Sequence, residues 1–144
     1  MVFYVVGFCI FLPTNEVVLI KKEKPAWQKG LLNGVGGKVE IGEVPSEAMV
    51  REFKEETGVK TQEKDWTLLS CLEDELGTCN FYFMKSREVL PVRSMEKEQI
   101  VVVPASNLPD NVVYNLRWMI PLANDPFVKW DVMSFFRLSY PVNQ

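Results

Sequence analysis

The sequence contains no histidine, and this absence excludes several kinds of catalytic site. Ser-His and Cys-His catalysis, imidazole acid–base chemistry and the common zinc sites all need that side chain. Cysteine is scarce, since Cys9, Cys71 and Cys79 form an odd number without metal-type spacing. Two of them lie in apolar, strand-like runs, so we expect buried free thiols in a reducing, cytoplasmic compartment. Any chemistry must use carboxylates, amines, hydroxyls, or metals held by oxygen.

The sequence also lacks a membrane-spanning run and an excess of positive charge. Its first residues, MVFYVVGFCIFL, are apolar but too short to cross a bilayer, and they have no basic region or cleavage site of a signal peptide. The formal net charge is −3, which indicates no general surface for membranes or nucleic acids. A polyanionic ligand would therefore need local basic groups or bridging cations.

The pattern along the 144 residues shows no repeat or linker and predicts one mixed α/β domain over residues 1–144, with helices packed on a sheet. Ser46 is the expected N-cap of the first helix and Gly58 its stop. The predicted elements are a hairpin (1–12 and 17–22), a polar loop (21–30), a glycine-rich extended segment (31–40), a helix (45–57), a second hairpin turning at Gly77-Thr78 (66–75 and 79–85), a charged loop (86–99), a short buried strand (100–104), a second helix (111–123) and a final strand that covers the core (130–144).

The first predicted helix concentrates negative charge on one face. Glu52, Glu55 and Glu56 fall within a stripe of about 100°, while Met49 and Phe53 turn mostly away from it. Like charges three and four residues apart destabilise a helix by a few tenths of a kcal/mol for each pair. One interpretation is a solvated acidic surface. The other is a site for a divalent cation, which would remove the repulsion.

The residues before and within this helix favour the cation site. Glycines at 34, 36, 37 and 42 allow close backbone approach, and Lys38 adds a cation beside them. Glu43 and Arg51 supply a further acid and base that could orient the acidic stripe.

These residues resemble the Nudix box. Gly37, five residues, Glu43, seven residues and then REFKEETGV match nine defined positions over 23 residues without a departure. The preceding LLNGVGGKVEIGE is similar to the approach to the box in MutT-like members that sanitise nucleotide pools. The resemblance implies an α/β/α sandwich with a mixed central sheet. It also implies an enzyme that uses Mg²⁺ or Mn²⁺ to hydrolyse a nucleoside diphosphate linked to another group.

Roles follow from the resemblance, residue by residue. Arg51 would hold the carboxylates in place, Lys38 would contact the substrate phosphates, and Glu43 and Gly58 would be mainly structural. The implied metal ligands are Glu52, Glu55, Glu56 and the Gly37 carbonyl. Many members place a further glutamate downstream of the box. Glu98 is the candidate for an additional ligand or general base, with Glu96 as the alternative. Glu73, Asp74 and Glu75 rank lower.

The resemblance to MutT-like triphosphatases also suggests residues that read the base. Asn33 lies where an asparagine can hydrogen-bond the base, and Asn115 lies where a second polar group reads its other edge. An amide suits this role because it both donates and accepts. Trp27 and Tyr114 could stack on a base, whereas Trp118 is expected in the core. The alternatives are a turn residue for Asn33 and a helix-surface residue for Asn115.

Several functional alternatives stay open at this point. ADP-ribose, dinucleoside polyphosphates, nucleotide sugars and RNA 5′ ends are other substrates of the family that the sequence does not exclude. A nucleotide-binding module without hydrolysis is a further alternative, although such proteins usually lose box glutamates, and this chain keeps them all. An acidic helix for protein interaction, with fortuitous spacing, is a third. The oligomeric state, monomer or homodimer, is open.

Overall fold

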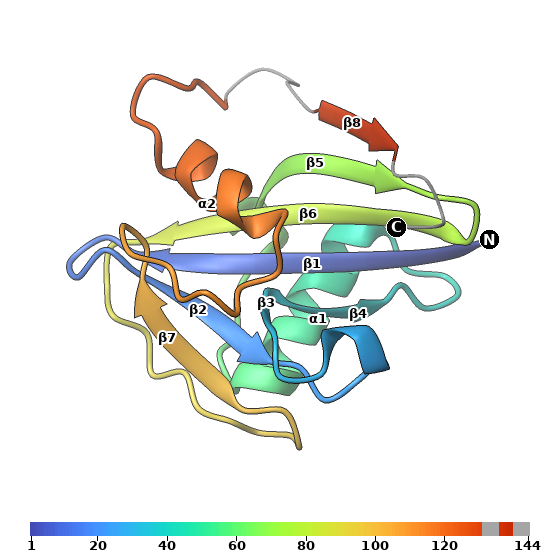
Figure 1. Ribbon diagram of the computed structural model, residues 1–144, viewed down its shortest axis with the longest axis horizontal. Coiled ribbons are helices and arrows are strands. Elements are labelled where there is room, and N and C mark those ends of the chain that lie inside the picture. The colour runs from blue at the N-terminus through green and yellow to red at the C-terminus, as the bar shows by residue number, and fades with distance from the viewer. Residues whose placement is uncertain (131–135, 140–144) are drawn as a thin grey trace.

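A mixed sheet with a helix on each face forms the body of the protein (Figure 1). The computed structural model describes residues 1–130 and the backbone of residues 136–139. Its elements are β1 (Val2–Phe11), β2 (Glu16–Lys21), the 3₁₀ turn η1 (Ala26–Gln28), β3 (Leu32–Asn33), β4 (Val35–Lys38), α1 (Pro45–Thr57), η2 (Glu63–Asp65), β5 (Thr67–Glu73), β6 (Gly77–Ser86), β7 (Ile100–Pro104), α2 (Leu116–Asn124) and β8 (Phe136–Ser139).

Strand β1 is the centre of the sheet. It runs parallel to β6 along its whole length and antiparallel to β2 and β4. The strand order is β3-β2-β1-β6-β5-β8, with β4 beside β1 and β7 beside β2. The two parallel pairs, β1–β6 and β5–β8, make the sheet mixed, as predicted. The N-terminal β1–β2 hairpin is also confirmed.

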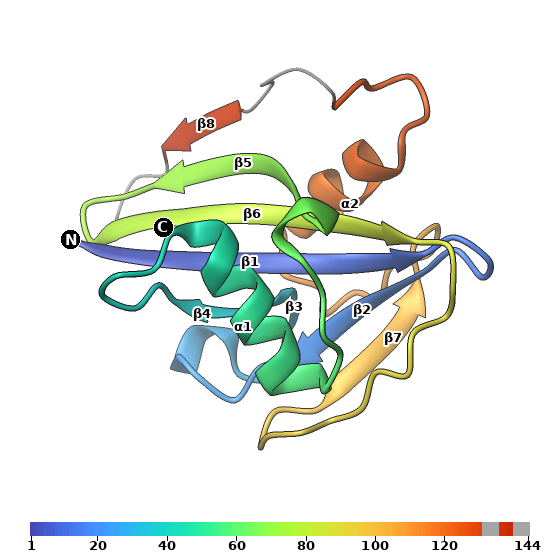
Figure 2. The same ribbon diagram turned by 180° about the vertical axis from the view of Figure 1, so that it is seen from behind.

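The alternating side chains of β1 supply both hydrophobic cores. Phe8 and Ile10 lie in the core beneath α2, whereas Val5, Cys9 and Phe11 lie in the core beneath α1. Figures 1 and 2 show α2 and α1 on opposite faces of the sheet. The predicted α/β/α sandwich is therefore confirmed.

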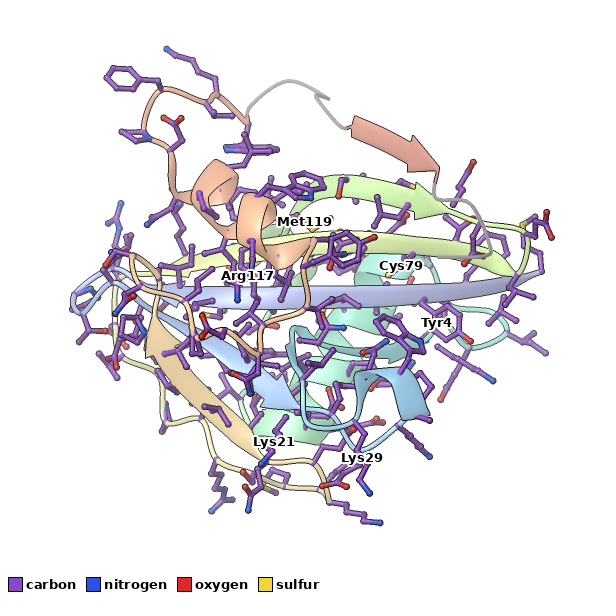
Figure 3. The ribbon with its side chains drawn as sticks, in the orientation of Figure 1. Tyr4, Lys21, Lys29, Cys79, Arg117 and Met119 are labelled. Carbon is purple, nitrogen blue, oxygen red and sulfur yellow. The ribbon has the colours of Figure 1, made fainter. Side chains whose placement is uncertain are left out.

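Each helix presents an apolar face to its side of the sheet. Met119 of α2 is fully buried and labelled in Figure 3. The buried side chains of α2 are Leu116, Met119, Ile120 and Ala123, and the buried apolar ones of α1 are Ala48, Met49 and Phe53.

Helix α1 spans the predicted residues 45–57, but its N-cap lies two residues before the predicted one. Its N-cap is Val44, and Pro45 occupies the first helical turn, where its missing N–H costs nothing. The prediction that Ser46 is the N-cap is wrong, because Ser46 lies inside the helix and its hydroxyl donates to Glu63. The stop at Gly58 is confirmed. Gly58 has a φ of 78°, and its N–H donates to the Lys54 carbonyl.

Helix α2 is shorter than predicted. The pattern indicated a helix over 111–123, but residues before Leu116 are not helical. The reason is tertiary, because Leu32 pairs with this segment. The Leu32 N–H donates to Asn111 O at 2.8 Å, and the Val113 N–H donates to Leu32 O at 2.9 Å. These bonds to β3 replace the helical ones, and the helix begins only after them.

Three further predictions are refined by the structure. The second hairpin is confirmed, but its turn is centred on Asp74, which accepts the Leu76 and Gly77 N–H groups, and Gly77 already belongs to β6. Strand β7 exists but is not buried, since only Val103 of its five residues is. Of the predicted strand over 130–144, the structure shows β8, which runs parallel to β5 at the edge of the sheet, and its covering of the core stays a prediction. Residues 131–135 and 140–144 lie outside the described part.

The predicted thiols are confirmed as free. Cys9 and Cys71 are buried, Cys79 is half-buried, and none of the three forms a disulfide in the described structure.

Close contact between β4 and β1 predicts a cost for a side chain at Gly36. A Cβ there would lie 1.9 Å from the Val5 carbonyl oxygen, so one strand must move. We expect Gly36→Ala to lower the free energy of unfolding by at least about 2 kcal/mol, measured by urea denaturation. Gly30→Ala is the control, because Gly30 has a φ of 82° but no atom within 4 Å of the added Cβ. Strain alone should cost about 1 kcal/mol there, and equal losses in both variants would contradict the prediction.

Candidate functional site

The acidic face of α1 packs against two glycines of β4, Gly36 and Gly37. A Cβ at Gly37 would lie 2.4 Å from Glu52 Oε1, so only glycine lets that carboxylate come so close to β4. One residue earlier, the Gly36 N–H donates to Glu56 Oε2 at 3.1 Å. The glycines of the extended segment therefore allow two carboxylates to meet the backbone of β4. The Gly37 backbone lies beside this pair.

Burial makes these carboxylates reluctant to ionise. Glu56 is 6% exposed, and burial raises its pKa to about 8. The charge of Glu52 adds to the rise, while Lys22 and the Gly36 N–H oppose it. Burial also raises the pKa of Glu52, against the hydrogen bond from Arg51. The two carboxylates are partly desolvated and repel each other, so a bound cation would stabilise their ionised forms.

Arg51 organises the outer side of the acidic cluster. Its Nε and Nη2 bind both oxygens of Glu43, at 3.1 and 2.6 Å. Its Nη1 donates to Glu52 at 2.8 Å and Glu55 at 3.3 Å, and Nη2 also reaches the Lys38 carbonyl at 2.9 Å. The hydrogen bond from Arg51 holds the pKa of Glu43 below its ordinary value despite partial desolvation. One guanidinium thus ties the loop before α1 to the helix and to the end of β4.

The residues present fit a hard divalent cation. Carboxylate and carbonyl oxygens are the ligands that Mg²⁺ and Mn²⁺ prefer. The space between Gly37 and the Glu52 carboxylate exists only because Gly37 has no Cβ. Within residues 1–130 no three acidic or sulfur side chains already converge on a common point. Arg51 instead holds Glu52 and Glu55, and Glu55 keeps 47% of its side chain exposed. Cation binding would require Glu55 to turn inward beside Glu52 and Glu56.

The loop over residues 86–99 closes the end of α1. The Arg93 N–H donates to Thr57 O at 3.1 Å, and the Met95 N–H donates to Glu56 O at 3.2 Å. These bonds satisfy carbonyls that a helix end leaves open. They also bring Glu96 close enough for its charge to add to the raised pKa values of Glu52 and Glu56.

Glu98 lies beside the same cluster but is held by other partners. Lys22 donates to its Oε1 at 3.1 Å, and the Glu23 N–H donates to Oε2. Burial raises the pKa of Glu98, yet these bonds outweigh it and leave the pKa lowered. Glu98 therefore stays ionised, and its partner Lys22 is the same cation whose charge opposes the rise in the pKa of Glu56.

Asn33 and Asn115, the predicted base-reading residues, are brought to neighbouring segments. Asn33 follows Leu32, whose backbone forms hydrogen bonds with Asn111 and Val113. Asn115 lies two residues after Val113. Each is only 7% exposed. Asn33 is partly committed, since its Oδ1 accepts the Gly34 N–H and its Nδ2 donates to Gln28. The buried Oδ1 of Asn115 has no partner among the described residues.

The aromatic candidates separate into one core residue and two exposed ones. Trp118 packs against the core beneath α2, as predicted. Trp27 is 65% exposed in η1, and Tyr114 is exposed before α2. Asp74, a lower-ranked acid, is occupied by backbone N–H groups of its own turn.

The sequence interpretation missed two residues beside the site. Lys22 lies at the end of the predicted hairpin, Gln28 lies in the predicted polar loop, and nothing in their spacing marks either residue. Lys22 reaches Glu98 and Glu56 because β2 ends next to the last residues of the charged loop, where the Lys21 N–H donates to Gln99 O. Gln28 reaches Asn33 because η1 folds back on β3.

This architecture and the box it carries correspond to a known family. The NUDIX domain model matches residues 2–130, so the chain belongs to the Nudix pyrophosphohydrolase family. Among curated proteins it is similar to the 8-oxo-dGTP diphosphatase of Escherichia coli K12, with 40% identity over 48 residues. That match spans 33% of this chain and 37% of the relative. Helices long and apolar enough to cross a membrane do not occur in the described part of the chain.

Solved Nudix structures share the fold. A MutT structure, from work on the Aliivibrio salmonicida and Vibrio cholerae enzymes, has a TM-score of 0.60 and 23% identity, covering 87% of this chain and 90% of that one. The Nudix domain of Shewanella oneidensis NrtR, complexed with ADP ribose, has a TM-score of 0.69 at 14% identity, covering 85% of each chain. The Escherichia coli dihydroneopterin triphosphate pyrophosphohydrolase has a TM-score of 0.63 at 17% identity, covering 83% and 92%.

The raised pKa of Glu56 predicts how stability depends on pH in the presence of a chelator. Between pH 4.5, its ordinary pKa, and about pH 8, the unfolded chain loses a proton that the folded chain keeps. The stability of the folded chain should therefore fall across this window. Glu56→Gln, which cannot ionise, should remove most of that fall. Urea midpoints measured from pH 5 to pH 8.5 test this.

Urea midpoints measured over the same pH range with Mg²⁺ present supply a second test. The cation needs ionised carboxylates, so its stabilising effect should grow as the pH rises through about 8 in the wild type and be much weaker in Glu56→Gln. Parallel pH profiles for the two proteins without metal would show that Glu56 does not have the raised pKa.

Proposed function

We propose that this protein is an Mg²⁺- or Mn²⁺-dependent pyrophosphohydrolase that converts a nucleoside triphosphate, unmodified or oxidised, into its monophosphate and pyrophosphate. The observation that carries the proposal is the meeting of Glu52 and Glu56 with the bare backbone of β4. It supports the proposal because carboxylate oxygens beside an open stretch of backbone are suited to sharing a hard cation with a phosphate chain. The partial match to an 8-oxo-dGTP diphosphatase supports the nucleotide class.

In this proposal each residue has a definite task. Glu52, Glu55, Glu56 and the Gly37 carbonyl hold the metal, and Arg51 orients the carboxylates through the bonds it makes to Glu43 and Glu52. A bound divalent ion would neutralise charge at phosphorus and lower the pKa of the attacking water. Lys38, exposed at the end of β4, contacts the phosphates.

Glu98 is the proposed general base, because it is a partly buried carboxylate that can accept a proton once it leaves its present partner Lys22. It would have to release Lys22, which then becomes free to bind a phosphate. Glu96 is the alternative, since its charge reaches both Glu52 and Glu56. Comparing Glu98→Gln with Glu96→Gln in the hydrolysis assay below separates the two.

Asn33 and Asn115 are proposed to read the base, with Trp27 stacking on it. The unpartnered Oδ1 of Asn115 supports this, because a buried acceptor left unpaired costs about 1–3 kcal/mol unless a ligand donates to it. Nucleotide-pool sanitation in the cytoplasm is the accompanying physiological proposal.

Hydrolysis of a nucleotide panel tests the chemistry. We expect Mg²⁺-dependent release of pyrophosphate from at least one nucleoside triphosphate, resolved by chromatography. Glu52→Gln, Glu55→Gln and Glu56→Gln should each lower kcat by about 100-fold or more, because a lost carboxylate weakens both metal binding and charge balance. Glu47→Gln, an exposed residue in the first turn of α1, is the matched control and should retain full activity.

The panel should include ADP-ribose, dinucleoside polyphosphates and triphosphorylated or capped RNA. Activity on one of these alone would keep the metal chemistry and replace the substrate. Tight nucleotide binding without turnover would identify a sensor, and unchanged rates in the glutamine variants would end the hydrolase proposal.

Base reading makes a separate prediction. Asn33→Ala and Asn115→Ala should each reduce the ratio of kcat/KM between the best and the worst base by roughly 5- to 10-fold, the effect of one hydrogen bond. Asn107→Ala is the matched control, because Asn107 is an exposed asparagine to which the proposal gives no role. Equal losses for every base would show that the two amides support the pocket without reading the base.

A further inference from the structure

The side-chain amide of Asn33 is oriented by two groups of opposite hydrogen-bonding character. The Gly34 N–H can only donate, so the Asn33 atom that it meets at 2.8 Å must be the oxygen. The Asn33 nitrogen then points to Gln28, whose Oε1 accepts from it at 3.0 Å. The two contacts agree on one orientation of the amide.

We propose that Gln28 is a positioning residue that fixes which face of the Asn33 amide a nucleotide base meets, and thereby sets base discrimination. This inference rests on the proposed base-reading role of Asn33. With one Nδ2 hydrogen used by Gln28, the amide has one N–H left to donate. Gln28 thus limits Asn33 to presenting one N–H donor to a ligand, while the Oδ1 of Asn115 is an acceptor without a partner among the described residues.

The backbone around Gln28 makes it a firm support. The Gln28 N–H donates to Pro25 O at 2.9 Å, and Gln28 O accepts the Leu31 N–H at 2.8 Å. These bonds close η1 against the start of β3, so the side chain of Gln28 is delivered to Asn33 from a fixed turn. Leu32, between them, is also bonded to the segment that leads to Asn115.

The position of this turn connects it with the proposed nucleotide pocket. Figure 3 shows Lys29, which follows Gln28, and Arg117, which follows Asn115 by two residues, on the side of the sheet that faces the viewer. Trp27, the proposed stacking residue, immediately precedes Gln28 and is exposed. Residues 27, 28 and 33 therefore belong to one unit, in which the ring would contact the face of a base and the amide its edge.

Without Gln28, the Asn33 amide loses the acceptor that fills one of its N–H groups. The freed N–H can pair with a different base edge, or the side chain can rotate away from the Gly34 N–H. Both outcomes weaken the preference for one base over another more than they weaken nucleotide binding as a whole. A merely structural role would instead lower the affinity for all bases alike.

Binding of the four unmodified nucleoside monophosphates GMP, AMP, CMP and UMP, measured by calorimetry, tests the inference without turnover. We expect Gln28→Ala to reduce the ratio of Kd values between the weakest and the tightest base by roughly 3- to 10-fold. Gln28→Glu keeps an acceptor for the Asn33 nitrogen and should hold the ratio within about twofold of the wild type. Gln99→Ala is the control, since its side chain is exposed at the end of the charged loop.

A double-mutant cycle separates positioning from support. In an Asn33→Ala background, Gln28→Ala should change the ratio no further, because the residue it positions is absent. An unchanged ratio in Gln28→Ala, or additive effects in the double variant, would overturn the role of Gln28 while leaving base reading by Asn33 intact. A wild-type ratio near one would overturn the base-reading proposal together with this inference.

Discussion

The site depends on one contact: the buried carboxylates of α1 against the glycine backbone of β4. A helix with this much negative charge on one face would repel itself in water, and burying the charge against a sheet costs more still. The arrangement is tolerable because the glycines at 36 and 37 leave room for the carboxylates beside the backbone, where the Gly36 N–H donates to Glu56. The raised pKa of Glu56 reflects the remaining free-energy cost of ionising this buried carboxylate, and a bound cation would offset that cost.

The rest of the fold keeps that contact in place. Strand β1 holds β4 by antiparallel pairing on one side and supplies the apolar residues against which α1 packs. Arg51 binds Glu43 in the preceding loop and Glu52 on the helix, so the loop and the helix cannot move independently. The charged loop caps the end of α1 through Thr57 and Glu56. Stability and the proposed chemistry are therefore coupled, because the residues that order the helix end also bring Glu96 and Glu98 to the site.

The proposed base pocket is built differently from the metal site. It rests on a short bridge between β3 and the segment before α2, and on the 3₁₀ turn that carries Trp27 and Gln28. Leu32 and Val112 of the bridge are buried in the core beneath α2, whereas η1 contains no buried residue. Differences in the loop that carries Gln28 would change base preference without disturbing the acidic cluster on α1.

The sequence alone determined the acidic stripe, the glycines before it and the Nudix box, because these residues lie close together in the chain and follow the period of one helix. It also determined both hairpins and a mixed α/β domain, since the alternation of apolar residues is local, and the resemblance to the Nudix family added the α/β/α sandwich. It could not give the true start of α2, because pairing with Leu32 overrides the helical pattern of residues 111–115. Nor could it show Lys22 beside Glu98 or Gln28 beside Asn33, since these contacts exist only where distant or folded-back segments meet. The periodicity of apolar residues shows which face of each helix or strand is buried. Only the tertiary structure decides which faces and loops come together.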